Sequence, residues 1–287
     1  MKKILITGKN SYIGTSFEKW MSQYPDEYSI NSIDMKDGSW REHDFSMYDV
    51  VFHVAGIAHV SCNKKLKDLY YKVNRDLTIE TAVKAKAEGV KQFIFMSSII
   101  VYGNGVDKSG MITKDTIPQP KDFYGDSKLQ AENGILPLND ENFKVVILRP
   151  PMIYGPGSKG NFPKLVKLAK ITPIFPDIGN MRSILYIDNL CEFIKAMIIH
   201  GESGLFFPQN KDYLETCEIV KTVAEVHGKK LLRTKLLNPV VMLMLRLEIV
   251  KKVFGNLAYD KSLSDYDNVN YQIINISESL WVMERVK

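Results

Sequence analysis

The 287-residue sequence contains little cysteine and no concentration of either charge. Its cysteines, Cys62, Cys191 and Cys217, are far apart, odd in number and without metal-ligand spacing, so we expect reduced thiols, no disulfide framework and no metal site. The net charge of +5 is small for this length and the lysines are dispersed, whereas a nucleic-acid partner requires a clustered basic face. Composition thus predicts an ordinary globular protein without a nucleic-acid partner.

Long hydrophobic runs are also absent. Only a few apolar residues follow Met1-Lys2-Lys3 before Gly8, fewer than a secretion signal requires. The most apolar segment, 238–254, is interrupted by Arg246 and Glu248 and is shorter than the ~20 apolar residues that span a bilayer. It predicts a helix packed against the protein or a subunit, with an interfacial membrane helix as the alternative. We expect a cytoplasmic protein with no stable membrane span.

Short, continuous apolar segments alternate with helical periodicity in the first half of the chain. Strands are predicted at 2–7, 28–33, 49–55, 91–98 and 143–150, and the main helical segment is 69–89 with Gly89 as its end. Strands that are apolar throughout suit a parallel sheet covered by helices on both faces. The sequence therefore predicts an α/β class, a Rossmann-like doubly wound parallel sheet.

The character of the sequence changes after Pro150, where a loop rich in proline and glycine begins. We expect residues 1–150 to form a nucleotide-binding core, to which 183–205 return. Residues 151–182 and 206–287 then form a smaller mixed α/β substrate-binding lobe. In such folds the ligand lies at the carboxyl ends of the strands, between core and lobe.

The stretch "LITGKNSYIG" fits a dinucleotide-binding turn. Gly8 allows a tight bend after the first strand, and Gly14 lets the following helix pack closely on the sheet, with its amino terminus facing the pyrophosphate. Ser11 replaces the usual middle glycine, so the turn alone is a weak signal. Asp34 ends the second predicted strand twenty residues after Gly14, where a carboxylate can bind the ribose hydroxyls of NAD. Lys9 and Lys36 nearby leave NADP as an alternative.

The segment "YGDSK" (124–128) carries the chemistry. Tyr124 and Lys128 are four residues apart in a predicted helix and so share a face. A tyrosine has an ordinary pKa of about 10, and a neighbouring ammonium favours the phenolate. Such a tyrosine exchanges a proton with an alcohol or ketone while a nicotinamide exchanges hydride. Ser98, at the end of a predicted strand, can hydrogen-bond the same substrate oxygen.

Together with "FHVAG", "KVN", "FMSSIIVYG" and "LRPPMIYGPG", these segments resemble the extended short-chain dehydrogenase/reductases, the NAD-dependent nucleotide-sugar epimerases and dehydratases. The resemblance covers about residues 1–200 and implies Ser98, Tyr124 and Lys128 as the catalytic set. It places the following residues around the cofactor: Gly8, Ser11, Tyr12, Ile13, Gly14, Asp34, Ala55, Gly56, Asn74, Lys128 and Pro150. Relatives commonly pair through helices of the core, so a homodimer is expected by analogy.

The resemblance also bears on the reaction. Relatives that remove water from 4-keto sugars carry an Asp-Glu pair after the active-site hydroxyl residue, and here those positions are Ile99 and Ile100. A 4,6-dehydratase is therefore not expected. Segments such as "FGNLAY" (254–259) resemble capsular-polysaccharide enzymes that reduce UDP-linked 4-keto-6-deoxy-hexosamines.

We accordingly favour a 4-keto-sugar reductase acting at C4 of a UDP-hexose. A UDP-sugar 4-epimerase with tightly bound NAD remains open, as does a non-catalytic dinucleotide sensor. Asn161 and Arg182 fall where relatives bind the nucleotide diphosphate, and a guanidinium grips phosphate through two parallel hydrogen bonds. The span from Asp34 to His53 is too short to contain a crossover helix found in longer relatives.

Overall fold

Six parallel strands form the central sheet of the computed structural model, which describes residues 1–58, 64–266 and 269–285. The strand order is β10-β6-β4-β3-β1-β2, and all neighbouring strands run parallel. The strands are β1 (Lys2–Thr7), β2 (Tyr28–Ile33), β3 (Val50–His53), β4 (Gln92–Met96), β6 (Lys144–Leu148) and β10 (Gly204–Phe206). The first five lie within the segments predicted as strands, and the predicted Rossmann-like α/β fold is confirmed. Cys62 lies outside the described residues.

Side chains of the central strands fill two cores, one on each face of the sheet. In β1, Ile4 and Ile6 join the core that contains Phe17 from the first helix, whereas Leu5 joins the core that contains Ala131 from a helix on the other face. Both faces being buried explains why the strands are apolar without alternation. Each fully buried isoleucine, leucine or phenylalanine side chain stabilises the fold by about 1.5–3 kcal/mol relative to the same side chain left exposed.

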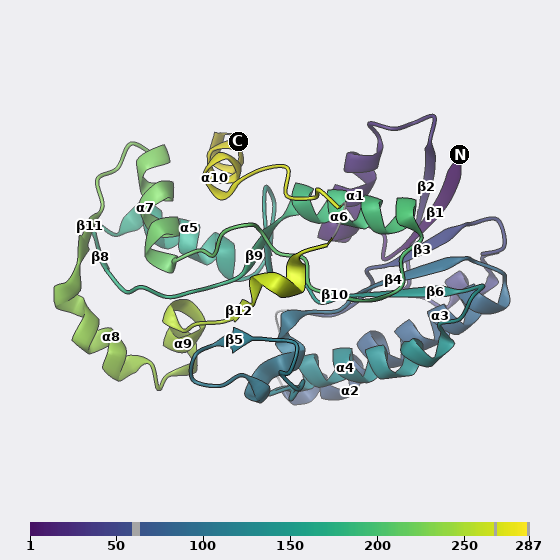
Figure 1. Ribbon diagram of the computed structural model, residues 1–287, viewed down its shortest axis with the longest axis horizontal. Coiled ribbons are helices and arrows are strands. Elements are labelled where there is room, and N and C mark those ends of the chain that lie inside the picture. Colours follow the sequence, from purple (N-terminus) through teal and green to yellow (C-terminus); the bar gives the residue numbers. More distant parts are fainter. Residues whose placement is uncertain (59–63, 267–268, 286–287) are drawn as a thin grey trace.

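Helices cover both faces of this sheet (Figure 1). On one face lie α1 (Tyr12–Met21) and α6 (Ile187–His200), which pack against each other; on the other lie α2 (Lys67–Tyr70), α3 (Leu77–Ala87) and α4 (Phe123–Ile135). The predicted helix 69–89 is thus built from α2, a π-helical segment Tyr71–Asp76 and α3. The last helical residue is Ala87, and Gly89, the predicted stop, follows two residues later with a φ of 82° that suits glycine. Single π-helical turns are frequent at functional sites, and this one carries Asn74.

The connection from β2 to β3 contains a single 3₁₀ turn, Ser39–Glu42, in place of a crossover helix. Trp40 and Phe45 from this connection are buried and fill part of the space against the sheet. Because the strand order ends at β2, the short connection leaves this strand at the edge of the sheet. The shortening inferred from the sequence is therefore real and lies beside Asp34.

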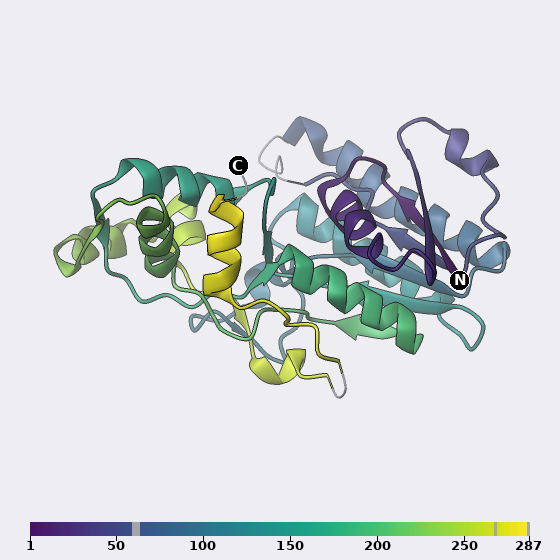
Figure 2. The ribbon, with the colours of Figure 1, turned by 90° about the horizontal axis from the view of Figure 1, so that it is seen from above.

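The rest of the chain forms three two-stranded sheets and five helices within the described residues. The pairs are β5 (Met111–Ile112) with β12 (Ala258–Tyr259), β7 (Met152–Tyr154) with β9 (Ile184–Tyr186), and β8 (Ile174–Pro176) with β11 (Leu232–Thr234). The helices are α5 (Asn161–Ile171), α7 (Thr216–Val226), α8 (Asn238–Met244), α9 (Glu248–Phe254) and α10 (Ile276–Arg285). Figure 2 shows α5, α7, α8 and α10 gathered at the end of the molecule away from the N-terminus.

Two local predictions need correction. The segment 183–205, expected to return to the core, begins with β9, which pairs with β7 and not with the central sheet; β10 joins the central sheet instead. The segment 238–254 forms two short helices, and α8 buries none of its residues, so a helix packed against its own protein is wrong for α8. Among the described residues, no helix combines the length and apolar character needed to cross a membrane.

Candidate active site

The turn after β1 is shaped by Gly8. Its φ of 122° is a conformation that favours glycine, and a Cβ there would lie 2.8 Å from the backbone nitrogen of Ala55. The backbone N–H groups of Gly8 and Lys9 donate to the carbonyl of Ile33 at the end of β2, at 3.0 and 2.9 Å. The turn is thus pressed between the ends of β2 and β3, with no room for a side chain at Gly8.

Helix α1 begins immediately after this turn. Ser11 caps it, its hydroxyl accepting a hydrogen bond from the Gly14 N–H at 3.2 Å. A Cβ at Gly14 would approach this hydroxyl to 2.6 Å and Ile6 to 3.1 Å, so Gly14 is needed where helix and sheet meet. Tyr12 and Ile13 form the first turn of the helix. An amino-terminal helix end beside a glycine turn favours a diphosphate.

Asp34 follows β2 directly and lies beside this turn, since Ile33 accepts the hydrogen bonds from Gly8 and Lys9. One of its oxygens accepts from the Lys36 N–H at 2.9 Å, and the other lies 3.8 Å from the Lys36 ammonium. The Asp34 side chain is 45 % exposed. The carboxylate is therefore accessible to hydroxyl groups of a ligand lying across the ends of β1 and β2.

A second wall of the site consists of Ala55, Gly56, Asn74 and Lys128. Asn74 is fully buried and is fixed by Ile57, whose N–H donates to its side-chain oxygen at 2.8 Å and whose carbonyl accepts from its amide at 3.1 Å. A Cβ at Gly56 would lie 3.1 Å from the Asn74 side-chain oxygen and 3.3 Å from the Lys128 ammonium. The structure thus brings these predicted cofactor residues together.

Tyr124 lies at the start of α4, which Asp122 caps by accepting from the Gly125 N–H at 2.9 Å. The Tyr124 phenol is hydrogen-bonded to Ser98, which follows β4. The Ser98 hydroxyl also accepts from the Ile100 N–H at 3.3 Å. Lys128, one turn further along α4, is 6 % exposed and donates to the Met96 carbonyl at 2.8 Å. The three predicted catalytic residues therefore share one end of β4 and α4.

Burial shifts the pKa values of both Tyr124 and Lys128 away from their ordinary values. Loss of hydration raises the pKa of Tyr124 to about 12, although the Ser98 hydrogen bond acts in the opposite direction. Burial lowers the pKa of Lys128 to about 8, partly opposed by Glu132. Burial therefore dominates the pKa of Tyr124, which lies above its ordinary value rather than near neutrality. Tyr124 is a protonated phenol at neutral pH, able to donate.

Beneath the site lies a buried charged network that the sequence did not reveal. Arg149 contacts Glu132 through Nε at 3.1 Å and Nη2 at 2.5 Å, and its Nη1 donates to the Tyr102 hydroxyl at 2.8 Å. The Ser97 hydroxyl also donates to Glu132. The Arg149 and Glu132 side chains are only 8 % and 4 % exposed. Glu132 lies one helical turn after Lys128 and so shares its face of α4.

Pro150, the remaining predicted cofactor residue, follows β6, and its carbonyl accepts from the Ile99 N–H at 3.0 Å. This bond ties the loop after β6 to the loop that carries Ser98.

The Tyr12 hydroxyl is buried without a hydrogen-bond partner in the described structure and lies beside Gly155, where a Cβ would approach it to 2.8 Å. His53 in β3 is fully buried, and its two ring nitrogens are hydrogen-bonded to the hydroxyls of Thr7 and Thr78, neither of which is a usual metal ligand.

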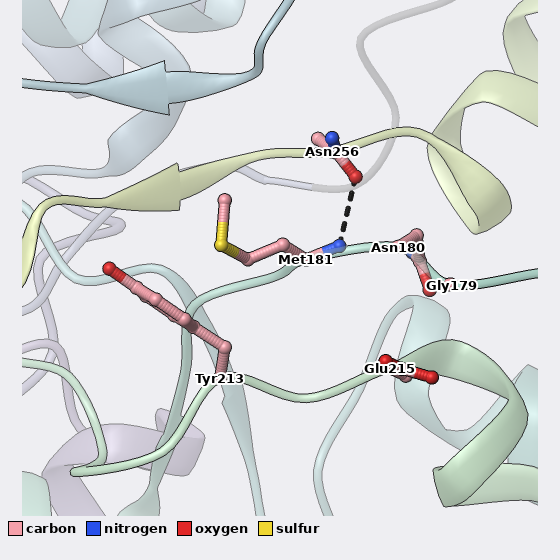
Figure 3. A pocket seen from close by; sticks show the side chains of 6 residues that line it. All are labelled: Gly179, Asn180, Met181, Tyr213, Glu215 and Asn256. Carbon is pink, nitrogen blue, oxygen red and sulfur yellow. Dashed lines mark hydrogen bonds between the residues drawn. The ribbon is translucent and has the colours of Figure 1, made fainter.

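The predicted diphosphate residues lie in the lobe. The backbone of Arg182 forms isolated β-bridges with Leu214 and with Leu257, and its side-chain Nη1 donates to the Gly255 carbonyl at 3.1 Å. Asn161 is the first residue of α5. A pocket of about 340 Å³ lies nearby in the sequence, lined not by Arg182 but by the residues that Figure 3 shows, which are Gly179, Asn180, Met181, Tyr213, Glu215 and Asn256. None of the predicted catalytic residues lines this pocket, so a ligand bound there would touch the lobe alone.

Fold and site define a Rossmann-type protein that carries a tyrosine–lysine pair beside a dinucleotide cradle. Residues 4–207 match the NAD dependent epimerase/dehydratase family, and the chain belongs to this family. It is 34 % identical over 247 residues to the UDP-glucose 4-epimerase of Vibrio cholerae, covering 78 % of this chain and 75 % of that protein. It is 24 % identical to the GDP-6-deoxy-D-mannose reductase of Pseudomonas aeruginosa, covering 78 % and 81 %.

Solved structures support the same fold. The UDP-glucuronic acid 4-epimerase from Bacillus cereus, in complex with UDP-glucuronic acid and NAD, superposes with a TM-score of 0.74 at 21 % identity, over 98 % of both chains. The cofactor of the family is NAD, and the residues in this chain fit it, because the amino terminus of α1 directly follows the Gly8 turn and the accessible Asp34 carboxylate lies beside that turn. The Vibrio and Pseudomonas relatives are a nucleotide-sugar epimerase and a nucleotide-sugar reductase, which agrees with the resemblance found in the sequence.

Proposed function

We propose that the chain is a NAD(P)-dependent reductase that converts the 4-keto group of a UDP-linked hexose to an alcohol. The observation that carries this proposal is the placement of Tyr124 beside Ser98 at the end of β4, with Lys128 one helical turn further along α4, because reduction of a ketone needs a proton donor at the carbonyl oxygen. Dinucleotide sensing without catalysis would need neither Tyr124 nor Ser98.

The proposed roles follow from the placement of each residue. Gly8, Ser11 and the start of α1 would hold the diphosphate, Asp34 the ribose hydroxyls, and Asn74 would keep the Gly56 wall in place. When bound, the reduced nicotinamide supplies hydride to C4 of the sugar.

Tyr124 would donate its proton to the C4 oxygen, and Ser98 would hydrogen-bond the same oxygen. Lys128, positively charged below about pH 8, would stabilise the phenolate that remains until the proton is replaced. Ile99 and Ile100 offer no acid or base for 4,6-dehydration. The lobe, 151–182 with 206–287, would hold the nucleotide sugar through Arg182 and Asn161, while 1–150 and 183–205 would hold the cofactor.

The short connection after Asp34 supports an exchangeable cofactor. With β2 at the sheet edge and Asp34 45 % exposed, the ribose-binding end of the cradle is open on one side. A reductase must release its oxidised cofactor in each cycle, whereas an epimerase keeps one NAD in place. The open ribose-binding end therefore favours a dinucleotide that is exchanged in each catalytic cycle over one that stays permanently bound.

A UDP-sugar 4-epimerase is the second candidate, favoured by the 34 % identity to the Vibrio cholerae enzyme. Oxidation at C4 followed by reduction from the opposite face would use the same Tyr124 and the same cofactor. The two reactions differ in whether the dinucleotide stays bound and in whether it is consumed. Both differences are measurable on the purified protein.

The test begins with protein purified without added nucleotide, denatured, and analysed for released dinucleotide. The reductase proposal expects a largely empty site and consumption of added NADH or NADPH with a UDP-4-keto-6-deoxy-hexosamine. Near-stoichiometric NAD, together with interconversion of UDP-hexoses without added cofactor, would establish the epimerase instead. Reversible NADH binding with no turnover of either substrate class would leave the sensor function and reject both enzymes.

A further inference from the structure

Segment 229–247 places a large amount of apolar side chain in water. Its most exposed apolar residues are Leu232, Leu236, Val240, Met242, Leu243 and Leu247, with 87 % of Leu236 and 73 % of Leu243 accessible. None of the residues of α8 is buried. Scattered exposed leucines are ordinary in proteins, but a contiguous exposed patch marks an interaction surface.

The patch continues onto neighbouring elements. Leu232 is in register with Ile174 across the β8–β11 pair, and both are exposed, as is Ile171 at the end of α5. The Lys229 ammonium donates to the Lys170 carbonyl, which joins the two segments. We call Ile171, Ile174 and residues 229–247 the α8 face. Figures 1 and 2 both place α8 at the end of the lobe farthest from the central sheet.

Positive charge surrounds these apolar residues. Residues 161–176 and 229–247 contain no aspartate or glutamate, and their basic residues are Lys164, Lys167, Lys170, Lys229, Lys230, Arg233, Lys235 and Arg246. Arg233 is neutralised by Asp177 and Glu218. Lys235 and Arg246, which flank α8, are exposed. The α8 face thus combines apolar side chains with a basic border.

We propose that the α8 face docks the protein on an anionic lipid surface. Leu236, Leu243 and their neighbours would enter the boundary between headgroups and acyl chains, while Lys235 and Arg246 would contact the headgroup phosphates. Charge decides against a second copy of the same face, because two borders of equal sign would repel each other. Docking through this face is independent of the reaction at Tyr124.

The experiment is sedimentation of the purified full chain with vesicles of phosphatidylcholine alone and of phosphatidylcholine mixed with phosphatidylglycerol. We expect binding to the anionic vesicles only. The double variant Leu236→Ser/Leu243→Ser should lose at least about ten-fold in partition, because apolar area drives insertion. Lys235→Glu/Arg246→Glu should lose about 20-fold or more. The matched control is Ile199→Ser, because Ile199 is a 52 % exposed apolar side chain on α6, away from the α8 face. This variant should bind the vesicles as the unaltered chain does.

Other outcomes would overturn the proposal. Failure of the chain to bind anionic vesicles would do so directly. Binding that the leucine substitutions leave unchanged would show non-specific attraction without insertion. A dimer that Leu236→Ser/Leu243→Ser converts to monomer, measured by light scattering, would assign the α8 face to self-association. Circular dichroism of each variant verifies folding, and the high exposure of the replaced side chains makes loss of fold unexpected.

Discussion

The buried Arg149–Glu132 pair provides a quantitative test of how the catalytic end of the sheet is held together. In Arg149→Met the Glu132 carboxylate keeps the Ser97 hydrogen bond but loses three contacts from the guanidinium, in a place where it is 4 % exposed. Removing one partner of a buried pair costs about 3–5 kcal/mol, because the remaining charge is uncompensated. Arg149→Met should therefore be strongly destabilised.

The expected shift in melting temperature follows from chain length. For 287 residues, about 2.1 cal/mol/K per residue gives an unfolding entropy of about 0.6 kcal/mol/K, so the loss corresponds to about 5–8 °C. Scanning calorimetry or thermal circular dichroism measures it. The double variant Glu132→Leu/Arg149→Met should recover much of the loss, because replacing both charges by apolar groups leaves no unpaired charge.

An exposed pair of the same residue types provides the control. Arg41 contacts Glu80 on the surface, with side chains 49 % and 45 % exposed, and exposed ion pairs contribute little to stability. Arg41→Met should shift the melting temperature far less than Arg149→Met. Equal shifts for the two variants, or a shift below about 2 °C for Arg149→Met, would refute the view that burial makes this pair indispensable.

Three further predictions concern the core and the cofactor. Burial lowers the pKa of His53 to about 3, so between about pH 6.5 and 3 the unfolded chain binds a proton that the folded chain does not. The free energy of unfolding should therefore fall by about 1.4 kcal/mol as the pH is lowered to 5.5. Denaturant titrations measure this fall, and a His53→Gln variant that keeps the same pH dependence would contradict the assignment to His53. Gly8→Ala should weaken NADH binding at least about ten-fold because its Cβ would strike the Ala55 backbone, while Gly89→Ala, also at positive φ but with open space around it, should leave the NADH affinity unchanged in a fluorescence titration. Asp34→Ala should lower affinity for NADH and raise it for NADPH, since the carboxylate repels a 2′-phosphate; an unchanged ratio of the two dissociation constants would remove Asp34 from the cofactor site.

Local patterns were sufficient to predict five of the six strands of the central sheet, all except β10. Strands buried on both faces must be apolar throughout, and glycines at 8 and 14 have few roles other than close packing at a strand-to-helix turn. The relative spacing of Ser98, Tyr124 and Lys128 likewise reflects a fixed geometry, because residues four apart share a helix face and strand ends meet at one edge. The structure brings these three residues together.

Features that depend on distant packing could not be read from the sequence. The Tyr124 pKa is raised above its ordinary value mainly by burial, which several elements contribute and which the spacing of Tyr124 and Lys128 does not reveal. Glu132 and Arg149 lie 17 residues apart, and neither sequence context marks the pair as buried. The pairing of β9 with β7 depends on the path of the lobe, and short strands carry too little pattern to specify a partner.

Substitution of Tyr124 tests the central claim most directly. The measurement compares Tyr124→Phe with the unaltered chain in NADH binding, by fluorescence titration, and in NADH consumption with a UDP-4-keto sugar. The phenyl ring retains the packing of Tyr124 against Tyr70, at 5.9 Å between ring centroids, but has no proton to donate. We predict unchanged NADH affinity and turnover reduced by at least about 100-fold. Turnover within a few-fold of the unaltered chain would contradict the role of Tyr124 as proton donor.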